Sequence, residues 1–295
     1  MRYRPLGRHG TAVSAVSLVM PDGPMNKSDV VQLVYGALEQ GVNCFEFSAE
    51  SDRATLQAAC NALQVVDRDL IIVALRLGHE RAERGLSLKT LQQALQIMLA
   101  ECKLGRLDIL TLEAPGPGEA LLPMFQALDK LRDAKRLRVL GVAGDGADLD
   151  PHIDSGRFDL ISLPFTISSG WVERNRLRRA LEREMIIFGS NFMPPEVPPK
   201  QESAAARGIK KLVGKAEDPN RQVYDFLHRS KDWTAEQICL AYALTEPSLA
   251  SIQVHASKAE HIEAMAKIPD REMPNGVPAL IEMARFSAGP QSKRA

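Results

Sequence analysis

Three charged residues interrupt apolar segments of the sequence. Glu46 lies in VNCFEFS, Arg76 in LIIVALRL and Glu113 in LDILTLEA. Two carboxylates beside a guanidinium can hold different proton affinities, so such a cluster can act as an acid/base pair or hold an anionic ligand. The alternative is a buried ion network in which the arginine bonds to both carboxylates. The residues alone leave both interpretations open.

Short apolar runs alternate along the chain with stretches of helical periodicity, and this alternation predicts how the three residues are positioned. Strands are expected at residues 16–20, 42–48, 70–77, 107–114, 138–144, 160–166, 185–191 and 249–257. Helices are expected near 27–40, 52–64, 87–104, 119–136, 148–155, 173–184, 234–244 and 258–268. This pattern predicts an α/β fold, a (β/α)8 TIM barrel, with an N-terminal β-hairpin before it and an extra C-terminal helix near 276–287.

Side chains alternate between the two faces of a strand, which predicts the direction of each residue in the barrel wall. Phe45 and Phe47 should face the helices, whereas Glu46 should face the barrel interior. In this fold the functional residues lie where the strands end. We therefore expect Glu46, Arg76 and Glu113 to meet at the barrel mouth, the end formed by the carboxyl ends of the strands.

Composition excludes several classes of function. The 295 residues carry 37 basic and 37 acidic side chains, without a basic stripe, so nucleic acid is not an expected partner. No apolar run approaches the roughly 20 residues that span a bilayer, and no apolar segment follows MRYRPLGRHG as in a secretory signal. We expect a cytoplasmic protein. The cysteines lack paired spacing and the histidines lack ligand spacing, so no metal is predicted. The sequence does not predict an oligomeric state.

A single domain is expected to span residues 1–295, because a barrel of this type needs about 250 residues. The strand–helix rhythm breaks at about 192–233, where the chain contains PPEVPP and the polar run KQESAAARG. This segment is expected to be a long loop insertion. It is either a functional loop over the barrel mouth, a disordered tether, an extended segment that docks a partner, or an ordinary exposed loop.

Several segments resemble the aldo-keto reductase family. The opening MRYRPLGRHGTAVSAVSLV is similar to that of bacterial members, in which a hairpin closes the barrel bottom. The resemblance continues, in the family's order, through LEQGVNCFEFS, LGRLDILTLEAP, LRDAKRLRVLGVAG, FDLISLPF, TAEQICLAYAL and LASIQVHASKAEHI. It spans nearly the whole chain and implies the same barrel fold.

The resemblance also locates the family's catalytic tetrad of Asp, Tyr, Lys and His, in which the Tyr is the acid for a carbonyl that receives hydride from NADPH. The family's G-x-N-x-F-D motif and its Tyr align on residues 41–52, with Glu46 in place of the Asp and Ser51 in place of the Tyr. Arg76 replaces the Lys and Glu113 the His. A serine hydroxyl is far less acidic than a phenol of pKa about 10, and arginine stays protonated. All four tetrad positions are therefore changed, although the steroid 5β-reductase branch of the family also carries a Glu at the position of Glu113.

The positions that hold the cofactor in the family are changed as well. Ala143 and Gly144 stand where a Ser-Asn pair binds the nicotinamide carboxamide, and Ser162 stands where a Gln does. Ser257 and Lys258, at the start of the last barrel helix, could still receive a phosphate at the helix N-terminus. No cofactor is therefore predicted, with NADP as the alternative.

These substitutions predict a barrel that has lost NADPH-dependent carbonyl reduction and serves as a binding or regulatory protein, a pseudoenzyme. The β subunits of Kv channels show that this family can serve as an interaction partner. The expected partner is a protein or a small polar or anionic ligand at the mouth. One alternative is a cofactor-independent lyase, dehydratase or isomerase, with Glu46 and Glu113 as acid and base and Arg76 holding an anionic substrate. The other is an atypical NADP-dependent oxidoreductase.

Overall fold

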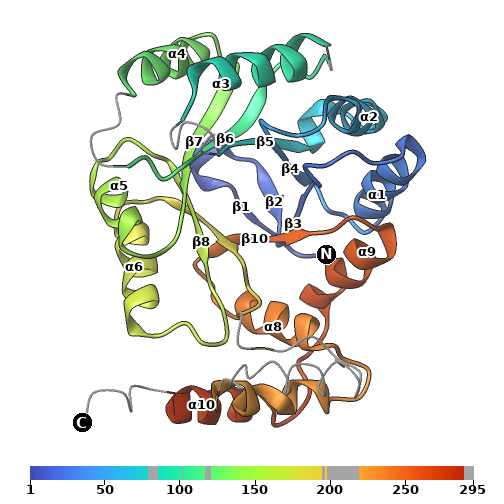
Figure 1. The fold of residues 1–295 in the computed structure, drawn as a ribbon, viewed down its shortest axis with the longest axis vertical. Coiled ribbons are helices and arrows are strands. Elements are labelled where there is room, and N and C mark those ends of the chain that lie inside the picture. Colours follow the sequence, from blue (N-terminus) through green and yellow to red (C-terminus); the bar gives the residue numbers. More distant parts are fainter. Residues whose placement is uncertain (79–85, 102, 117–120, 195–196, 198–218, 289–295) are drawn as a thin grey trace, which may run out of the picture.

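Eight parallel strands close into a barrel in this computed structural model, which describes residues 1–78, 86–101, 103–116, 121–194, 197 and 219–288. The order around the barrel is β10, β3, β4, β5, β6, β7, β8, β9, and helices surround it (Figure 1). The barrel strands are β3 (Val16–Val19), β4 (Cys44–Ser48), β5 (Ile72–Leu77), β6 (Leu107–Glu113), β7 (Leu137–Ala143), β8 (Leu160–Pro164), β9 (Ile186–Ser190) and β10 (Leu249–His255). Each overlaps a strand expected from the sequence, and the predicted fold class is confirmed.

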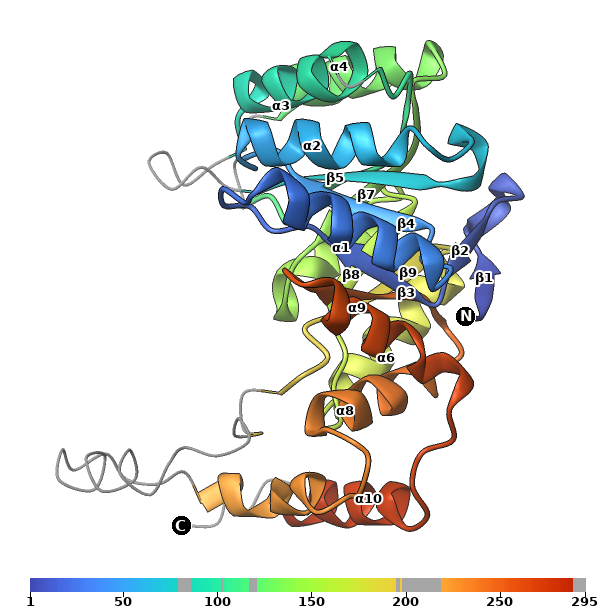
Figure 2. The same cartoon turned by 90° about the vertical axis from the view of Figure 1, so that its right-hand side faces the viewer.

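The helices follow the predicted alternation with the strands. They are α1 (Lys27–Glu39), α2 (Arg53–Leu63), α3 (Leu88–Leu95), α4 (Leu122–Asp133), α5 (Asp150–Asp154), α6 (Trp171–Glu182), α8 (Ala235–Leu244), α9 (Ala259–Ala266) and the extra C-terminal α10 (Val277–Ala288). Shorter turns are η1 (Gly7–His9), η2 (Arg68–Leu70), the π-helical η3 (Gln96–Glu101), η4 (Gly146–Leu149), η5 (Pro219–His228) and η6 (Ile268–Asp270). The 3-10 helix η5 lies in the expected insertion and was not predicted; it packs beside α10 (Figure 2).

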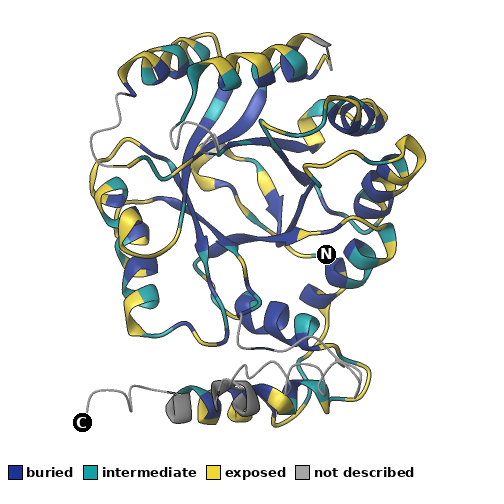
Figure 3. Cartoon of the chain, in the orientation of Figure 1, coloured by how far each residue is buried: buried dark blue, intermediate teal, exposed yellow. Residues whose placement is uncertain are grey.

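The barrel wall separates two apolar cores, as the predicted alternation requires. Phe45 and Phe47 are buried in the core between strands and helices. Cys44 and Ala74 instead lie in a core inside the barrel. The strands are buried along most of their length (Figure 3). The predicted directions of these side chains are confirmed, because β4 and β5 pair without a bulge.

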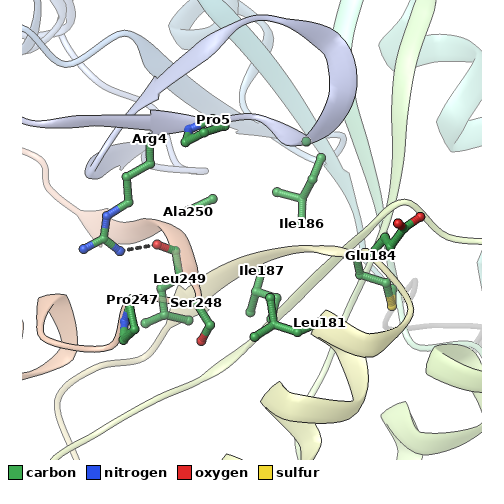
Figure 4. Close-up of a pocket in the computed structure, with 12 residues that line it drawn as sticks. Arg4, Pro5, Leu181, Glu184, Ile186, Ile187, Pro247, Ser248, Leu249 and Ala250 are labelled. Carbon is green, nitrogen blue, oxygen red and sulfur yellow. Dashed lines mark hydrogen bonds between the residues drawn. The ribbon is translucent and has the colours of Figure 1, made fainter.

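An N-terminal hairpin of β1 (Tyr3–Pro5) and β2 (Ala12–Ser14) closes one end of the barrel (Figure 2). Leu6 and Val13 from this hairpin join the core inside the barrel. At this end the Arg4 guanidinium donates to the carbonyl oxygens of Leu244, Glu246 and Leu249. A cavity of about 360 Å³ lies between the hairpin and the first residues of β9 and β10 (Figure 4). The hairpin therefore fastens the start of the chain to the last barrel strand.

A cluster of charged residues lies near the first residues of β6 and β7, at the end of the barrel opposite the mouth. Asp108 on β6 is completely buried, and its carboxylate lies 2.7 Å from Arg68, 3.2 Å from Arg106 and 3.2 Å from Arg138. The backbone N–H of Val73 donates to the same carboxylate at 2.9 Å. Because the buried charge is paired and hydrogen-bonded, it can be accommodated in the fold.

Within the described ranges, no helix combines the length and the apolar character needed to cross a membrane. Cys44, Cys60 and Cys239 are buried, as expected for core packing, and Cys102 lies outside the described residues.

Candidate functional site

A cavity of about 380 Å³ opens at the carboxyl ends of the barrel strands. We call it the mouth cavity. Its lining comes from most of the strands and from the loops that follow them, and it consists of Asp22, Ser48, Glu50, Arg76, Gly78, Glu113, Ala143, Gly144, Asp145, Ser162, Pro164, Ser190, Asn191 and His255. Polar residues predominate. In a TIM barrel this is the end at which functional sites are built.

Strand register brings the predicted residues to the mouth. Ser48 on β4 pairs with Arg76 on β5, which pairs with Thr111 on β6, and two residues further along β6 is Glu113. Glu46 lies one interior position below Ser48 and is only 3% exposed. The carboxylate of Glu113 lies beside Gly78, with Oε2 3.2 Å from the place a Cβ would occupy there. The predicted convergence of Arg76 and Glu113 on the mouth is present, with Glu46 beneath them.

A chain of polar contacts crosses the barrel under the mouth cavity. Arg76 Nε lies 3.5 Å from Glu46 Oε1. The amide of Gln253 donates to Glu46 Oε2 at 2.5 Å, and Gln253 Oε1 accepts from Ser162 Oγ at 2.7 Å. Gln253, Glu46 and Ser162 are all buried. The structure thus contains one of the two ion pairs of the predicted network, the pair between Arg76 and Glu46.

Burial determines the protonation of Glu46. Removal from water raises the pKa of this carboxyl above its ordinary value, and the Arg76 charge and the Gln253 hydrogen bond only partly oppose that effect. Glu46 Oε1 has no hydrogen-bond partner among the described residues. Glu46 is therefore a buried acid that holds its proton more strongly than a carboxyl in water.

Sequence reasoning missed Gln253 as a member of the site. It lies on β10 between two apolar residues, Ile252 and Val254, both of which face the helix-side core. The same alternation that was applied to Glu46 would have placed Gln253 inside the barrel. His255, two residues further along β10, lines the mouth cavity, and burial together with the Arg76 charge lowers its pKa.

Ser51 does not line the mouth cavity, although it aligns with the catalytic tyrosine of the resembling family. Its backbone N–H donates to the Ser48 carbonyl at 3.2 Å, and the next residue, Asp52, caps α2 by accepting from the Thr55 N–H at 2.9 Å. The turn that starts α2 thus fixes Ser51. Its Oγ is buried without a hydrogen-bond partner in the described part of the chain.

All four tyrosines of the sequence lie in the described ranges, and none of them lines the mouth cavity. Tyr3 is on the hairpin, where its hydroxyl donates to the Gly41 carbonyl at 2.8 Å. Tyr35 is on α1, and Tyr224 is buried in η5. Tyr242 on α8 donates to Glu282 of α10 at 3.2 Å, outside the barrel. No phenol is therefore in place to act as an acid at the mouth.

The positions aligned with the nicotinamide site line the mouth cavity but offer few hydrogen-bonding groups. Ala143 and Gly144 have no polar side chain, and a Cβ at Gly144 would lie 3.1 Å from the Ala114 Cβ. Ser162 is buried, and its hydroxyl already donates to Gln253. At these three positions, therefore, no side-chain N–H or O–H is left to donate to the carboxamide of NADPH.

The two residues expected to receive a phosphate lie away from the lining of the mouth cavity. Ser257 and Lys258 are exposed just before α9, where Lys258 is the N-cap residue. The first turn of α9 also contains Glu260. A carboxylate at that position opposes the attraction of a helix N-terminus for a phosphate.

Several other aromatic residues and histidines do not line the mouth cavity. Trp171 begins α6 and is 77% exposed, and Phe192 is buried in the helix-side core, so neither of them blocks the cavity. His152 contacts Phe158, and His261 on α9 lies 3.0 Å from Glu236 on α8. His79 lies outside the described residues. In the part of the chain that is described, no group of three His, Cys, Asp or Glu side chains could hold a metal ion.

The fold agrees with the comparisons with known proteins. Residues 15–156 match the model of the aldo/keto reductase family. Aldo-keto reductase AKR11C1 from Bacillus halodurans, in its holo form, is similar in structure over 100% of both chains, with a TM-score of 0.75 and 15% identity. An aldo-keto reductase from Klebsiella pneumoniae in complex with NADPH has a TM-score of 0.70 and 17% identity over 100% of this chain and 98% of its own.

A third similar structure is the thermostable aldo-keto reductase Tm1743 with the inhibitor epalrestat, with a TM-score of 0.71 and 16% identity over 97% of this chain and 99% of its own. No curated protein sequence matches the chain. The barrel and its N-terminal hairpin are the fold of these solved structures. Together with the match to the family model over residues 15–156, this fold supports membership of the aldo/keto reductase family.

Proposed function

We propose that this barrel binds a small polar ligand at its mouth and does not reduce carbonyl groups with NADPH. The observation that carries the proposal is the placement of the four tyrosines, all of them away from the mouth cavity. Carbonyl reduction needs a proton donor beside the oxygen that receives the charge, and removal of a positioned acid costs about a hundred- to ten-thousand-fold in rate. Ser51, at the aligned position, is held in the turn before α2.

The nicotinamide side of the mouth supports the same proposal independently. The Ser162 hydroxyl donates its hydrogen bond to Gln253. The side chains of Ala143 and Gly144 have no group that could donate or accept a hydrogen bond. A cofactor that bound here would lose the hydrogen bonds of its carboxamide to water without replacing them. Regulation through a protein partner, the other part of the prediction, stays a prediction.

The test is a calorimetric titration of the full chain with NADPH and NADP⁺, together with the melting temperature at increasing cofactor concentration. We expect no binding up to millimolar cofactor and no consumption of NADPH with a panel of aldehydes and ketones. Binding in the micromolar range with carbonyl-dependent oxidation of NADPH would overturn the proposal. An atypical NADP-dependent oxidoreductase would then be the better description.

A second candidate is acid/base chemistry without a cofactor, favoured by the raised pKa of Glu46. A carboxyl that stays protonated above its ordinary pKa can donate a proton, and Glu113 at the mouth could accept one. The structure limits the role of Glu46, because it is 3% exposed and lies beneath the cavity. Proton exchange from deuterated solvent into a bound ligand, abolished in both Glu46→Gln and Glu113→Gln, would favour this candidate over binding alone.

A further inference from the structure

A second cavity lies on the helix side of the barrel wall, where α4, α5 and the loops beside them meet. Its volume is about 630 Å³. We call it the rim cavity, and its described lining consists of Ala114, Pro115, Gly116, Leu121, Leu122, Phe125, Ala147, Asp148, Pro151, His152, Ser155, Arg157 and Phe158. None of these residues lines the mouth cavity. Residues 117–120 lie outside the described residues, and the site is defined without them.

Three aromatic rings line the rim cavity and hold one another in place. The rings of Phe125 and Phe158 meet edge to face with their centroids 6.2 Å apart, and the His152 ring meets Phe158 edge to face at 5.6 Å. His152 Nε2 also lies 3.3 Å from the carbonyl oxygen of Pro115 in the loop after β6. The cavity therefore has an aromatic wall against which another ring can pack in the same edge-to-face manner.

Part of the apolar lining is open to water. Leu121 is buried, but Leu122 beside it is 66% exposed, and Pro151 at the start of α5 is exposed as well. Removal of apolar surface from water is favourable. A ligand with an apolar body therefore gains by covering Leu122 and Pro151.

Arg157 is the one arginine or lysine in the described lining of the rim cavity. Its guanidinium carbon, Cζ, lies over the Phe125 ring, 4.4 Å from the ring centroid. This contact uses the charge of the guanidinium and leaves its N–H groups able to donate. Within the described ranges these N–H groups have no hydrogen-bond acceptor. Arg157 is thus a cation positioned by a ring, with donors suited to a carboxylate.

The two charges of the lining lie at opposite ends of α5. Asp148 precedes this helix and Arg157 follows it. A helix of five residues is about 7.5 Å long, so its length separates the two charges. A carboxylate that binds at Arg157 therefore avoids Asp148, and a ring attached to that carboxylate reaches the aromatic wall.

We infer that the rim cavity binds a small aromatic carboxylate, with its carboxylate at Arg157 and its ring against Phe158 and His152. A cavity of about 630 Å³ with a mainly apolar lining and few polar groups is typical of small-molecule sites. The inference does not depend on the proposed function, because the rim cavity and the mouth cavity share no lining residue.

Four compounds of similar size test the charge and the ring by calorimetry on the full chain: 3-phenylpropionate, 3-phenylpropanol, 3-phenylpropylamine and 3-cyclohexylpropionate. We expect 3-phenylpropionate to bind most tightly, the alcohol and the cyclohexyl acid to bind roughly threefold or more weakly, and the amine to bind most weakly. The affinity of the aromatic acid should fall as ionic strength rises. Equal or tighter binding of any of the other three, or no binding of 3-phenylpropionate up to millimolar concentration, would overturn the inference.

Two variants assign the binding to the rim cavity. Arg157→Gln and Phe125→Leu should each weaken binding of 3-phenylpropionate roughly three- to tenfold, the first by loss of the charged donor and the second by loss of the ring. Arg157→Gln should also abolish the preference for the acid over the alcohol. Arg136→Gln is the matched control, because Arg136 is an exposed arginine outside the lining of either cavity. Equal affinities in the three folded variants would place the compound elsewhere and contradict the inference.

Two further measurements exclude other sites and occupants. Arg76→Gln changes the arginine of the mouth cavity, and it should leave the affinity for 3-phenylpropionate unchanged. A loss of affinity as large as that in Arg157→Gln would place the acid at the mouth and overturn the inference. Sedimentation of the full chain tests whether a second copy covers the rim cavity instead. A dimer that Leu122→Asp dissociates would also overturn the inference.

Discussion

Gln253 on β10 donates its side-chain amide at 2.5 Å to Glu46 on β4, which lies on the other side of β3, although 207 residues separate the two in sequence. This bond joins the last barrel strand to the second and holds a carboxyl beneath the mouth cavity. Because Glu46 is buried, its protonation state is coupled to the stability of the barrel.

Replacement of Glu46 by glutamine should reduce the pH dependence of stability. Burial raises the pKa of Glu46 in the folded state. The stabilisation that protonated Glu46 contributes to folding is therefore fully present below the unfolded-state pKa, and it is lost as the pH rises through the raised folded-state pKa. Glu46→Gln stays neutral and can still accept from Gln253. The free energy of unfolding, measured with urea across this pH range, should fall less with rising pH for Glu46→Gln than for the parent chain.

Glu46→Ala is the contrasting variant. It leaves the buried amide of Gln253 without an acceptor, at a cost of about 1–3 kcal/mol at neutral pH. If the free energies of unfolding of Glu46→Gln and of the parent chain fell in parallel as the pH rises, the raised pKa of buried Glu46 would be contradicted.

Asp108→Asn should destabilise the fold by about 3–5 kcal/mol, because it removes the buried carboxylate that Arg68, Arg106 and Arg138 share. Denaturant unfolding measures the change. Asp69→Asn is the control: Asp69 pairs with Arg106 but is 75% exposed, so its loss should cost much less stability than the loss of Asp108. Similar losses of stability in Asp108→Asn and Asp69→Asn would contradict the argument that burial makes the Asp108 charge more costly to remove.

Arg4→Ala should lower the free energy of unfolding by about 1–3 kcal/mol, since the carbonyls of Leu244, Glu246 and Leu249 lose their donor. Arg8→Ala is a matched change on the same hairpin. Arg8 pairs with Glu184 on the surface and is 80% exposed, so its loss should cost less than about 1 kcal/mol. Equal melting temperatures for Arg4→Ala and Arg8→Ala would contradict a stabilising effect of the Arg4 hydrogen bonds.

His261 and Glu236 link α9 to α8, and the hydrogen bond raises the pKa of His261. The stabilisation is full below the unfolded-state pKa of the histidine and is lost as pH rises through the raised folded value. Both side chains are about a third exposed, so solvent screening keeps the effect well under about 1 kcal/mol. A chemical-shift titration should show the raised pKa, and Glu236→Gln should remove it. An unchanged titration in that variant would contradict the assignment.

The sequence predicted correctly those features that depend on interactions between residues close together in the chain. Alternation along β4 predicted the opposite directions of Phe47 and Glu46, because the strand pairs with β5 without a bulge. The strand–helix rhythm predicted the barrel, since each unit buries one face against the next. The 3-10 helix η5 could not be predicted, because its geometry lacks the 3.6-residue period that identifies an α-helix.

Partners across the barrel were beyond sequence reasoning. Alternation can place Gln253 inside the barrel, but it does not show that the amide meets Glu46 and Ser162, which come from other strands. β10 also has a register shift between Leu249 and Ser251. The acidic residues Asp22 and Glu50 in the lining of the mouth cavity were missed for a similar reason. Both lie in loops after the strands, and their approach to Asp145 depends on the curvature of the whole barrel.

Closure of the barrel by β10 has a consequence for synthesis on the ribosome. Until residues 249–255 have emerged, β3 and β9 each lack a neighbour on one side and expose a row of backbone N–H and C=O groups. The Arg4 contacts on the hairpin also wait for this strand and the end of α8. A nascent chain that ends before β10 is therefore an open sheet with two unpaired edges, the form most exposed to aggregation and most dependent on chaperones.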